Sequence, residues 1–548
     1  MKTLNKFALT FGNLDIYQKL FVTLFSLIFV FLFVQNFIFS SSFDILLYRS
    51  IDDYAFQKVL RECHENIFYF KKPLSLFVIN SYGYGWLFWI IHVVLTLPFY
   101  LISILGSDFL LISMARNISL FFMIGSCFVL FKISKLYTKD KYIPYFIILF
   151  FMSYGFFAFS AMSFRTIAQS CFFCVLTLYL TLRNKEISKK DLKYIAISLS
   201  ACIGSKLSTA LILPLIAILL LDRFNFNFNK ENFKKSVYFL KYLIPFSIFF
   251  SNPSLFYSPF KSQLLTNYLD IMSHHLNAIK TNYGDSSSLF EIFKSAFFEN
   301  YLNKYLMSFS LLVLFLKLIN DIKNLRKNKF DFLYYFIFLI SLSLYLVNNI
   351  KMGASYVANY FFSFSFILIL SLVYLDKFKP KITYALLIAL FFLNIFLNFN
   401  QATNYYFEFF TKKNSQITKN NFSAQYDMQK LVGPDDQKMN ILADAHSPSI
   451  YSDFRKNVKT IYVYDNISVV KDWLPAENFD YILLNKNSVI NSSDEYFKIK
   501  YENSSPDIKK ILLDSRNIVD VLIKKNIFGK VKYNLIYDKY DLLLFKKI

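Results

Sequence analysis

The sequence predicts an α-helical polytopic membrane domain of about eleven spanning helices, followed by a small extracytoplasmic α/β domain. Apolar residues make up 55% of the 548 positions, and the mean hydropathy is +0.38. Apolar runs of roughly twenty residues recur between 21 and 399, and each is long enough to cross a hydrocarbon core of about 30 Å. After residue 400, short apolar runs alternate with polar stretches, which is typical of a mixed domain outside the membrane.

The first apolar run, residues 20–39, is interpreted as an uncleaved membrane anchor. It follows Lys2, Lys6 and Lys19. It is longer than the apolar region of a signal peptide, and no small-residue cleavage site follows it. We therefore expect the N-terminus to be cytoplasmic.

The distribution of positive charge predicts the topology of the remaining helices. Lysine and arginine gather in five short loops, which should be cytoplasmic because positive charge is retained on that side. These loops lie at 132–141, 183–190, 223–235, 323–329 and 377–381. The expected helices are 18–40, 111–131, 142–161, 165–182, 193–205, 207–221, 236–250, 301–320, 331–348, 356–376 and 381–400, which places the C-terminus outside.

Two segments are compatible with more than one membrane topology. Residues 193–221 are interpreted as two short helices that meet at Gly204-Ser205-Lys206, because a single crossing would move the basic loop 223–235 outside. Residues 86–105 are apolar enough to cross, but counting them would invert two basic loops. We expect them to form a helix on or dipping into the outer leaflet, within a long external loop at 41–110.

The C-terminal part is predicted to be a separate external domain. The division is a transmembrane domain at 1–405, a polar linker at 406–425 and an α/β domain at 426–548. Four apolar runs should be strands and one amphipathic stretch a helix. The strands are expected at 439–443, 460–464, 480–484 and 534–538, and the helix at 506–526.

Composition also limits the partners and cofactors. The net charge of +23 is explained by the membrane loops and a lysine-rich composition, so no nucleic-acid partner is expected. The five cysteines fall mostly in predicted helices, where Cys171 and Cys174 should be small buried hydrophobes rather than a redox pair. No cofactor is required by any motif, and His274-His275 is interpreted as an ordinary loop.

The residues with the clearest chemistry are Asp52 and Asp53, which follow the first helix. Two carboxylates at an external membrane interface can supply a general base, ligands for a divalent metal, or both. Acidic pairs are also common in solvated loops, so the pair alone does not decide between these interpretations. Whether a metal binds here is left open by the sequence.

Further motifs give the pair a context. The acidic pair, followed by a Pro-containing and then a Gly-rich segment, resembles the first external loop of the GT-C glycosyltransferases, in the branch of the protein O-mannosyltransferases and the lipid A aminoarabinose transferases. Asp52 matches the acid that opens this loop in the family, and Asp53 stands where Glu is usual. The family's frequent Pro-Pro pair is only Lys72-Pro73 here. The other matching positions are Tyr82-Gly83-Tyr84-Gly85-Trp86-Leu87, Arg116, Arg165, Gly204-Ser205-Lys206 and Asn252-Pro253.

The resemblance implies an inverting transfer of a sugar from a polyprenyl-phosphate donor to a lipid, glycan or protein acceptor on the outer face. Asp52 would be the base, with Asp53 beside it. The departing phosphate would be held by cations at outer helix ends, namely Arg116, Arg165, Lys206 and Lys351. In a bacterium this would be an inner-membrane enzyme of cell-envelope glycan synthesis.

Three alternatives stay open. A flippase-type transporter of lipid-linked saccharides would suit eleven helices, but such proteins usually show a repeat or broken helices with polar midplane residues. An oligosaccharide polymerase or ligase would share the lipid donor and place its basic residues in large external loops. A catalytically inactive relative could act as a scaffold.

Overall fold

The computed structural model describes residues 14–38, 85–103, 109–153 and 160–253 with few gaps, short pieces within 59–77, residues 312–322, and much of 423–548. These residues belong to two compact units, a helical unit and a C-terminal α/β unit. Each unit is considered by itself below. The acidic pair Asp52 and Asp53, Lys351, His274-His275 and the predicted boundaries at 405 and 425 lie outside the described residues.

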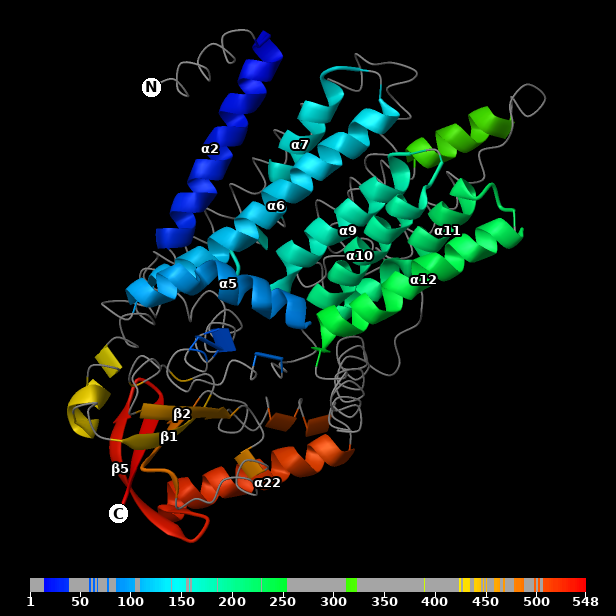
Figure 1. Ribbon diagram of the computed structural model, residues 1–548. Helices are drawn as coiled ribbons and strands as arrows, with labels where there is room; N and C mark the ends of the chain where they lie inside the picture. The colour runs from blue at the N-terminus through cyan, green and yellow to red at the C-terminus, as the bar shows by residue number, and fades with distance from the viewer. Residues whose placement is uncertain are drawn as a thin grey trace. The chain divides into compact units, whose positions relative to one another are not determined.

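The described part of the helical unit is a bundle of long helices (Figure 1). Each of the seven helices predicted between 18 and 250 is confirmed as helical structure. In chain order the elements are α2 (Ile16–Ile38), α5 (Trp86–Ser103), α6 (Phe109–Tyr137), α7 (Ile143–Ser153), α9 (Thr166–Leu182), α10 (Lys189–Ser205), the 3₁₀ helix η2 (Leu207–Ile212), α11 (Leu213–Arg223) and α12 (Lys230–Ser251).

Several polar contacts bring the basic loops to one end of this bundle, here called the basic end. Lys141, just before α7, forms an ion pair of 2.7 Å with Asp15, just before α2. The ammonium of Lys132, near the end of α6, lies 5.6 Å from the centre of the Tyr179 ring near the end of α9. At the end of α11, the Arg223 guanidinium donates to the carbonyl oxygen that ends α9, at 3.3 Å. The loops at 132–141, 183–190 and 223–235 therefore share one end.

The other end, here called the polar end, is joined by buried polar contacts. Asn36, near the end of α2, donates to Asn117 near the start of α6 at 2.9 Å and to the carbonyl of Ala161 at 3.2 Å. Gln169, in the first turn of α9, donates to Ser205 at the end of α10 at 2.9 Å. The helices thus alternate in direction, as the charge pattern predicts. On which side of a membrane each end lies stays a prediction.

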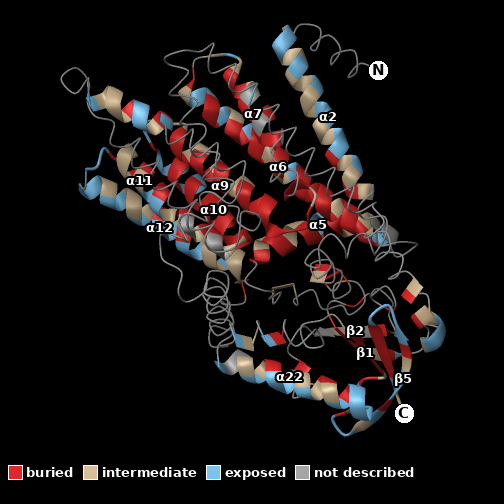
Figure 2. Cartoon of the chain, turned by 180° about the vertical axis from the view of Figure 1, so that it is seen from behind, coloured by how far each residue is buried: buried red, intermediate tan, exposed pale blue. Residues whose placement is uncertain are grey.

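Two described helices are long and apolar enough to cross a membrane. They are Ile16–Phe37 and Leu110–Tyr137, while Trp86–Leu101 and Thr166–Leu182 are apolar but shorter. Much of α2 is exposed and apolar, including Leu27 at 62%. Buried residues concentrate on α6, α9 and α10 (Figure 2). The full count of eleven crossings is not established by the described residues and stays a prediction.

Segment 86–105 forms a helix, as expected, and it contributes to the core of the unit. The side chains of Phe88 and Trp89 on α5 are fully buried, whereas Val94 and Leu95 on its other side are more than half exposed. The buried face packs with Leu111 of α6 and other residues of one apolar cluster. How α5 lies relative to a membrane leaflet is untested.

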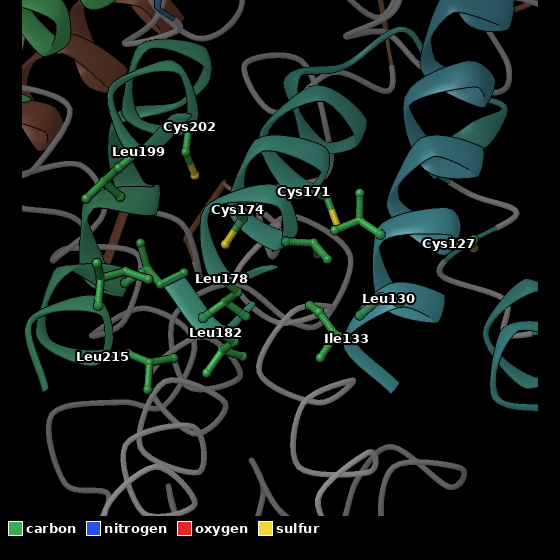
Figure 3. Close-up of a cluster of buried hydrophobic side chains, with 14 of the residues drawn as sticks. Cys127, Leu130, Ile133, Cys171, Cys174, Leu178, Leu182, Leu199, Cys202 and Leu215 are labelled. Carbon is green, nitrogen blue, oxygen red and sulfur yellow. The ribbon is translucent and has the colours of Figure 1, made fainter. Parts of the chain in front are cut away.

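The cysteines behave as buried hydrophobes. All five are free and buried, and Cys127, Cys171, Cys174 and Cys202 share one apolar cluster between α6, α9 and α10 (Figure 3). Thiols packed among leucine and isoleucine side chains are inert, because burial disfavours the reactive thiolate. The interpretation of Cys171 and Cys174 as core residues is confirmed.

The α/β unit contains one six-stranded sheet. The four predicted strands are confirmed as β1 (Met439–Asp444), β2 (Val458–Val463), β3 (Tyr481–Asn485) and β5 (Val531–Lys539). The sheet order is β2-β1-β3-β6-β5-β4, in which β1 pairs in parallel with β2 and β3, and the other pairs are antiparallel. The remaining elements are β4 (Ile527–Phe528), β6 (Leu542–Lys547) and α22 (Pro506–Lys525).

Both faces of this sheet are covered. Val519 and Leu522 of α22 pack against one face. Ala424, Met428 and Ile450 pack against the other. Because β1 and β3 are buried on both sides, their residues read as nearly continuous apolar runs, as expected for inner strands. The unit has an apolar core of its own.

Candidate functional site

Three of the four predicted phosphate-binding cations are described, and all three come from segments that meet at the polar end. Arg165 precedes α9, Lys206 follows α10, and Arg116 lies two turns into α6. Their predicted roles are not tested by these positions. The positions do show which elements carry the charges.

Arg165 occupies the N-cap position of α9. Its backbone is extended, with φ −141° and ψ 161°, and its side chain is largely buried. The preceding residue, Phe164, is fixed between two rings of α5, with its ring centre 5.6 Å from that of Phe88 and 6.3 Å from that of Trp89. The packing of α5 therefore sets where the backbone of Arg165 lies.

Arg116 is fully buried within α6. Its neighbour Ala115 packs in the same cluster as Phe164, and its other neighbour, Asn117, accepts the hydrogen bond from Asn36. A guanidinium does not lose its proton in a protein. Arg116 therefore brings a full positive charge into the interior of the polar end.

Lys206 stands at a break between two helices. α10 ends at Ser205, Lys206 is extended with φ −155° and ψ 117°, and η2 begins directly afterwards. The Ser205 hydroxyl accepts from Gln169 and donates to the carbonyl of Ala201 at 2.7 Å. The Thr209 hydroxyl donates to the Lys206 carbonyl at 2.6 Å. The prediction of two helices meeting at 204–206 is confirmed.

Two glycines allow the backbones of α5 and α10 to touch at this break. The amide of Gly85 donates to the Ser205 carbonyl at 3.4 Å. A Cβ atom on Gly85 would lie 1.7 Å from the carbonyl oxygen of Gly204, and one on Gly204 would lie 2.3 Å from the Cβ of Phe250 in α12. Only glycine fits at either position, so the start of α5 is held directly against the segment that carries Lys206.

The helix dipoles add little net charge at this end. The N-termini of α5 and α9 meet the C-termini of α10 and α12 here. Each terminus carries roughly half an elementary charge, positive at the start of a helix and negative at its end, so these four contributions largely cancel.

Two histidines contribute polar groups that the sequence did not single out. His64 and His92 are fully buried, and His64 stacks on the ring of Tyr100 at 4.6 Å. Thr96 donates its hydroxyl proton to the His92 carbonyl at 2.6 Å, so its oxygen must accept from Nε2 of His64 at 3.0 Å. Burial lowers the pKa of His64 to about 4, so the ring is neutral at pH 7. His64 packs against α5 through Thr96 and Tyr100.

The signal that could have revealed these histidines is weak. His92 lies four residues from both Phe88 and Thr96, so the three share one face of α5. A lone histidine on an apolar helix face is most often a satisfied core residue. Nδ1 of His92 does lie 2.9 Å from the Phe88 carbonyl.

A metal site is not found among the described residues, which contain no group of three or more His, Cys, Asp or Glu side chains able to hold an ion. A divalent metal at the acidic pair therefore stays a prediction.

Comparisons with known proteins leave the family open. No protein-family model matches the chain, and no curated protein matches it. Among solved structures, the chain is similar to an oligosaccharyltransferase of Archaeoglobus fulgidus crystallised in complex with zinc and sulfate, with 13% identity and a TM-score of 0.42. The match covers 80% of this chain and 63% of that one. A TM-score of this size establishes neither a shared fold nor a shared activity.

Proposed function

We propose that this protein is a membrane glycosyltransferase that moves a sugar from a polyprenyl-phosphate donor to an acceptor on the extracytoplasmic face. The observation that carries the proposal is the separation of charge along the bundle. Basic loops lie at one end, and the buried or half-buried cations Arg116, Arg165 and Lys206 come from segments that meet at the other. Charged side chains inside a membrane bundle are rare, and they commonly mark a pathway that a charged substrate requires.

A lipid phosphate fits this requirement. Its charge lies at the membrane surface while its chain lies in the bilayer, so it must be met by cations near helix ends. Arg165 and Lys206 both stand at helix ends, and the contact between Gln169 and Ser205 couples the elements that carry them. The motif resemblance supports the same assignment.

In the proposed reaction Asp52 accepts the proton of an acceptor hydroxyl or amine as its oxygen or nitrogen attacks the anomeric carbon. The bond from that carbon to the phosphate oxygen breaks, and the electron pair leaves with the polyprenyl phosphate. Arg165 and Lys206 stabilise the charge that develops on the leaving group, and Lys351 and Arg116 would add to the positive field. Asp53 is the reserve candidate for the base.

The test is transfer in lipid nanodiscs with a matched lipid-linked donor. Asp52→Asn keeps the size and polarity of the side chain but removes the base, so turnover should fall by about 10²-fold or more. Asp53→Asn is the matched control, and its turnover should fall much less. An Asp52→Asn protein with near-normal turnover would refute the assignment of that residue.

A second variant separates binding from chemistry. Lys206→Ala should weaken donor affinity, because a charge-assisted contact to phosphate acts in the ground state as well as in the transition state. The same assay distinguishes the alternatives. A flippase would move the donor lipid across the bilayer without any loss of the sugar, and a polymerase or ligase would transfer only donors that carry an oligosaccharide.

A further inference from the structure

Lysines gather at one corner of the α/β unit, where α22 ends and the hairpin of β4 and β5 follows. They come from α22, β5, β6 and the turn between β4 and β5, and all of them are exposed. This lysine patch consists of Lys524, Lys525, Lys530, Lys532 and Lys546. The local sequence explains its charge, since residues 521–534 contain four lysines and no aspartate or glutamate.

Backbone contacts hold the segments of the lysine patch together. The amide of Tyr533 donates to the carbonyl of Asn526 at 2.8 Å, which joins the start of β5 to the end of α22. The register pairs Asn534 with Lys546, so Lys532 and Lys546 are diagonal neighbours on one face of the sheet. The fold itself therefore brings these charges together.

The positive charge of the patch is only partly balanced by acids of the adjoining segments. Asp520 lies 3.7 Å from the Lys524 ammonium, and both side chains are at the surface. Asp480, just before β3, meets the end of β6, because its carbonyl accepts from the amide of Lys547 at 2.8 Å. Its carboxylate accepts from the amide of Asn440 at 2.8 Å. Five lysines against these two carboxylates leave a net charge of +3.

Exposed apolar side chains accompany the lysines. Val521 and Ile523, near the end of α22, are 39% and 42% exposed. Lysines at a helix end and at a sheet edge have structural uses, since they complement the helix dipole and discourage pairing with another chain. Neither use calls for exposed valine and isoleucine beside them. Lysines mixed with exposed aliphatic groups are typical of surfaces that lie on a bilayer, where the charges meet anionic headgroups and the apolar groups reach the acyl boundary.

We propose that the lysine patch docks the α/β unit onto a bilayer surface that contains anionic lipid. A bilayer is within reach of this unit, because α2 and α6 of the same chain are long and apolar enough to cross one. A tethered unit needs only weak intrinsic affinity, since attachment gives the second contact a high effective concentration. Each lysine near an anionic surface strengthens the contact about fivefold, so several together suffice.

The test uses the full chain in lipid nanodiscs, made either of phosphatidylcholine alone or of phosphatidylcholine mixed with phosphatidylglycerol. Ile523→Cys carries an NBD fluorophore, and the five native cysteines are buried, so the unsubstituted protein serves as the labelling control. Lipids with nitroxide headgroups quench the fluorophore when the patch lies on the bilayer. We expect quenching with phosphatidylglycerol, much less without it, and a decrease at high salt, which screens exposed charges.

Charge variants then test the patch itself. Removing two of its charges, by Lys530→Gln with Lys532→Gln, should lower the ratio of docked to undocked protein roughly 25-fold, at about fivefold per charge. Lys530→Arg with Lys532→Arg keeps the charge and should keep the docking. Both positions are exposed, so folding should survive in either variant.

The matched control removes two exposed charges elsewhere on the same unit, by Lys510→Gln with Lys539→Gln. Lys510 precedes Lys524 on α22 by roughly 21 Å, at 1.5 Å per residue. Lys539 follows Lys532 on β5 by roughly 23 Å, at 3.3 Å per residue. Both distances exceed the Debye length of about 8–10 Å, so docking should change little.

Three results would overturn the docking surface, namely no quenching with phosphatidylglycerol, equal quenching with and without it, or equal loss in the two Lys→Gln double variants. A change in NBD fluorescence on adding heparin, without any quenching that depends on the lipid, would show that the partner is a soluble anionic glycan and would overturn the proposal as well. Docking does not require sugar transfer, so Asp52→Asn should dock normally.

Discussion

The contact between α5 and α10 gives the sharpest prediction about the helical unit. In Gly85→Ala the added Cβ would lie 1.7 Å from the carbonyl oxygen of Gly204, about half the distance of an ordinary contact. The obstacle is backbone, so no side chain can rotate away. The start of α5 must therefore separate from the break at Lys206, and the amide of Gly85 loses its bond to Ser205.

The magnitude follows from the overlap. Overpacking in a rigid core costs typically about 1–3 kcal/mol, and the lost hydrogen bond adds about 1 kcal/mol. We therefore expect Gly85→Ala to lower the free energy of unfolding by about 2–4 kcal/mol, measured by thermal unfolding in a mild detergent. If the contact also positions Lys206, donor affinity should fall in the same variant.

Gly125→Ala is the matched control within the same unit. Its Cβ would meet the ring of Phe172 at 2.9 Å, and a side chain can give way where a backbone cannot. Gly125→Ala should therefore lower the free energy of unfolding much less than Gly85→Ala. Equal destabilisation by the two substitutions would refute the argument that a backbone contact fixes the break.

Further predictions concern topology, pH and capping. Single cysteines in a cysteine-free background should be labelled from the cytoplasm at 135, 189, 234, 326 and 379 and from outside at 433, and outside labelling at both 135 and 189 would mean that 86–105 spans. Stability should fall as pH drops from about 6.5 to 4, by up to about 3 kcal/mol for His64, because the unfolded ring takes up a proton that the folded one refuses. His64→Gln should flatten this melting profile, and an unchanged profile would contradict the assignment. Asp191→Asn should lower the free energy of unfolding by about 1–2 kcal/mol, because it weakens a capping box with Ser188 and a 2.6 Å ion pair with Arg183. The control Asp222→Asn, at the same end of the bundle, should lower it less, and thermal unfolding measures both.

Local patterns predicted the elements well. The apolar runs identified the helices up to 251 and four of the six strands, because the signal lies in neighbouring residues. β6 was not among the predicted strands. Its run Leu542 to Phe545 is buried between β3 and β5, and a short, fully buried run has no alternation to distinguish it from a helix.

The sequence alone did not predict contacts between residues that are far apart in the chain. Nothing local to Gly85 shows that it must touch Gly204, and nothing local to His64 shows that it packs on Tyr100. Charge patterning did group the basic loops, because that rule concerns a property of the whole segment rather than one contact. The roles assigned to Asp52, Asp53 and Lys351 rest on sequence alone.

Burial, rather than depth along the bundle, separates the three described candidates for the donor phosphate. Arg116 lies level with Arg165, because its neighbour Ala115 shares an apolar cluster with Phe164, and Gly125, further along α6, lies against Phe172 of α9. Arg116 is fully buried within its helix, whereas Lys206 is half-buried at a helix end and Arg165 stands at the start of α9. A phosphate attached to a membrane lipid stays near the headgroups, since burying its charge in hydrocarbon is far costlier than leaving it at the surface. Direct contact is therefore expected from Arg165 and Lys206, and Arg116 would act on the phosphate mainly through its field, which decays slowly in a low-dielectric interior.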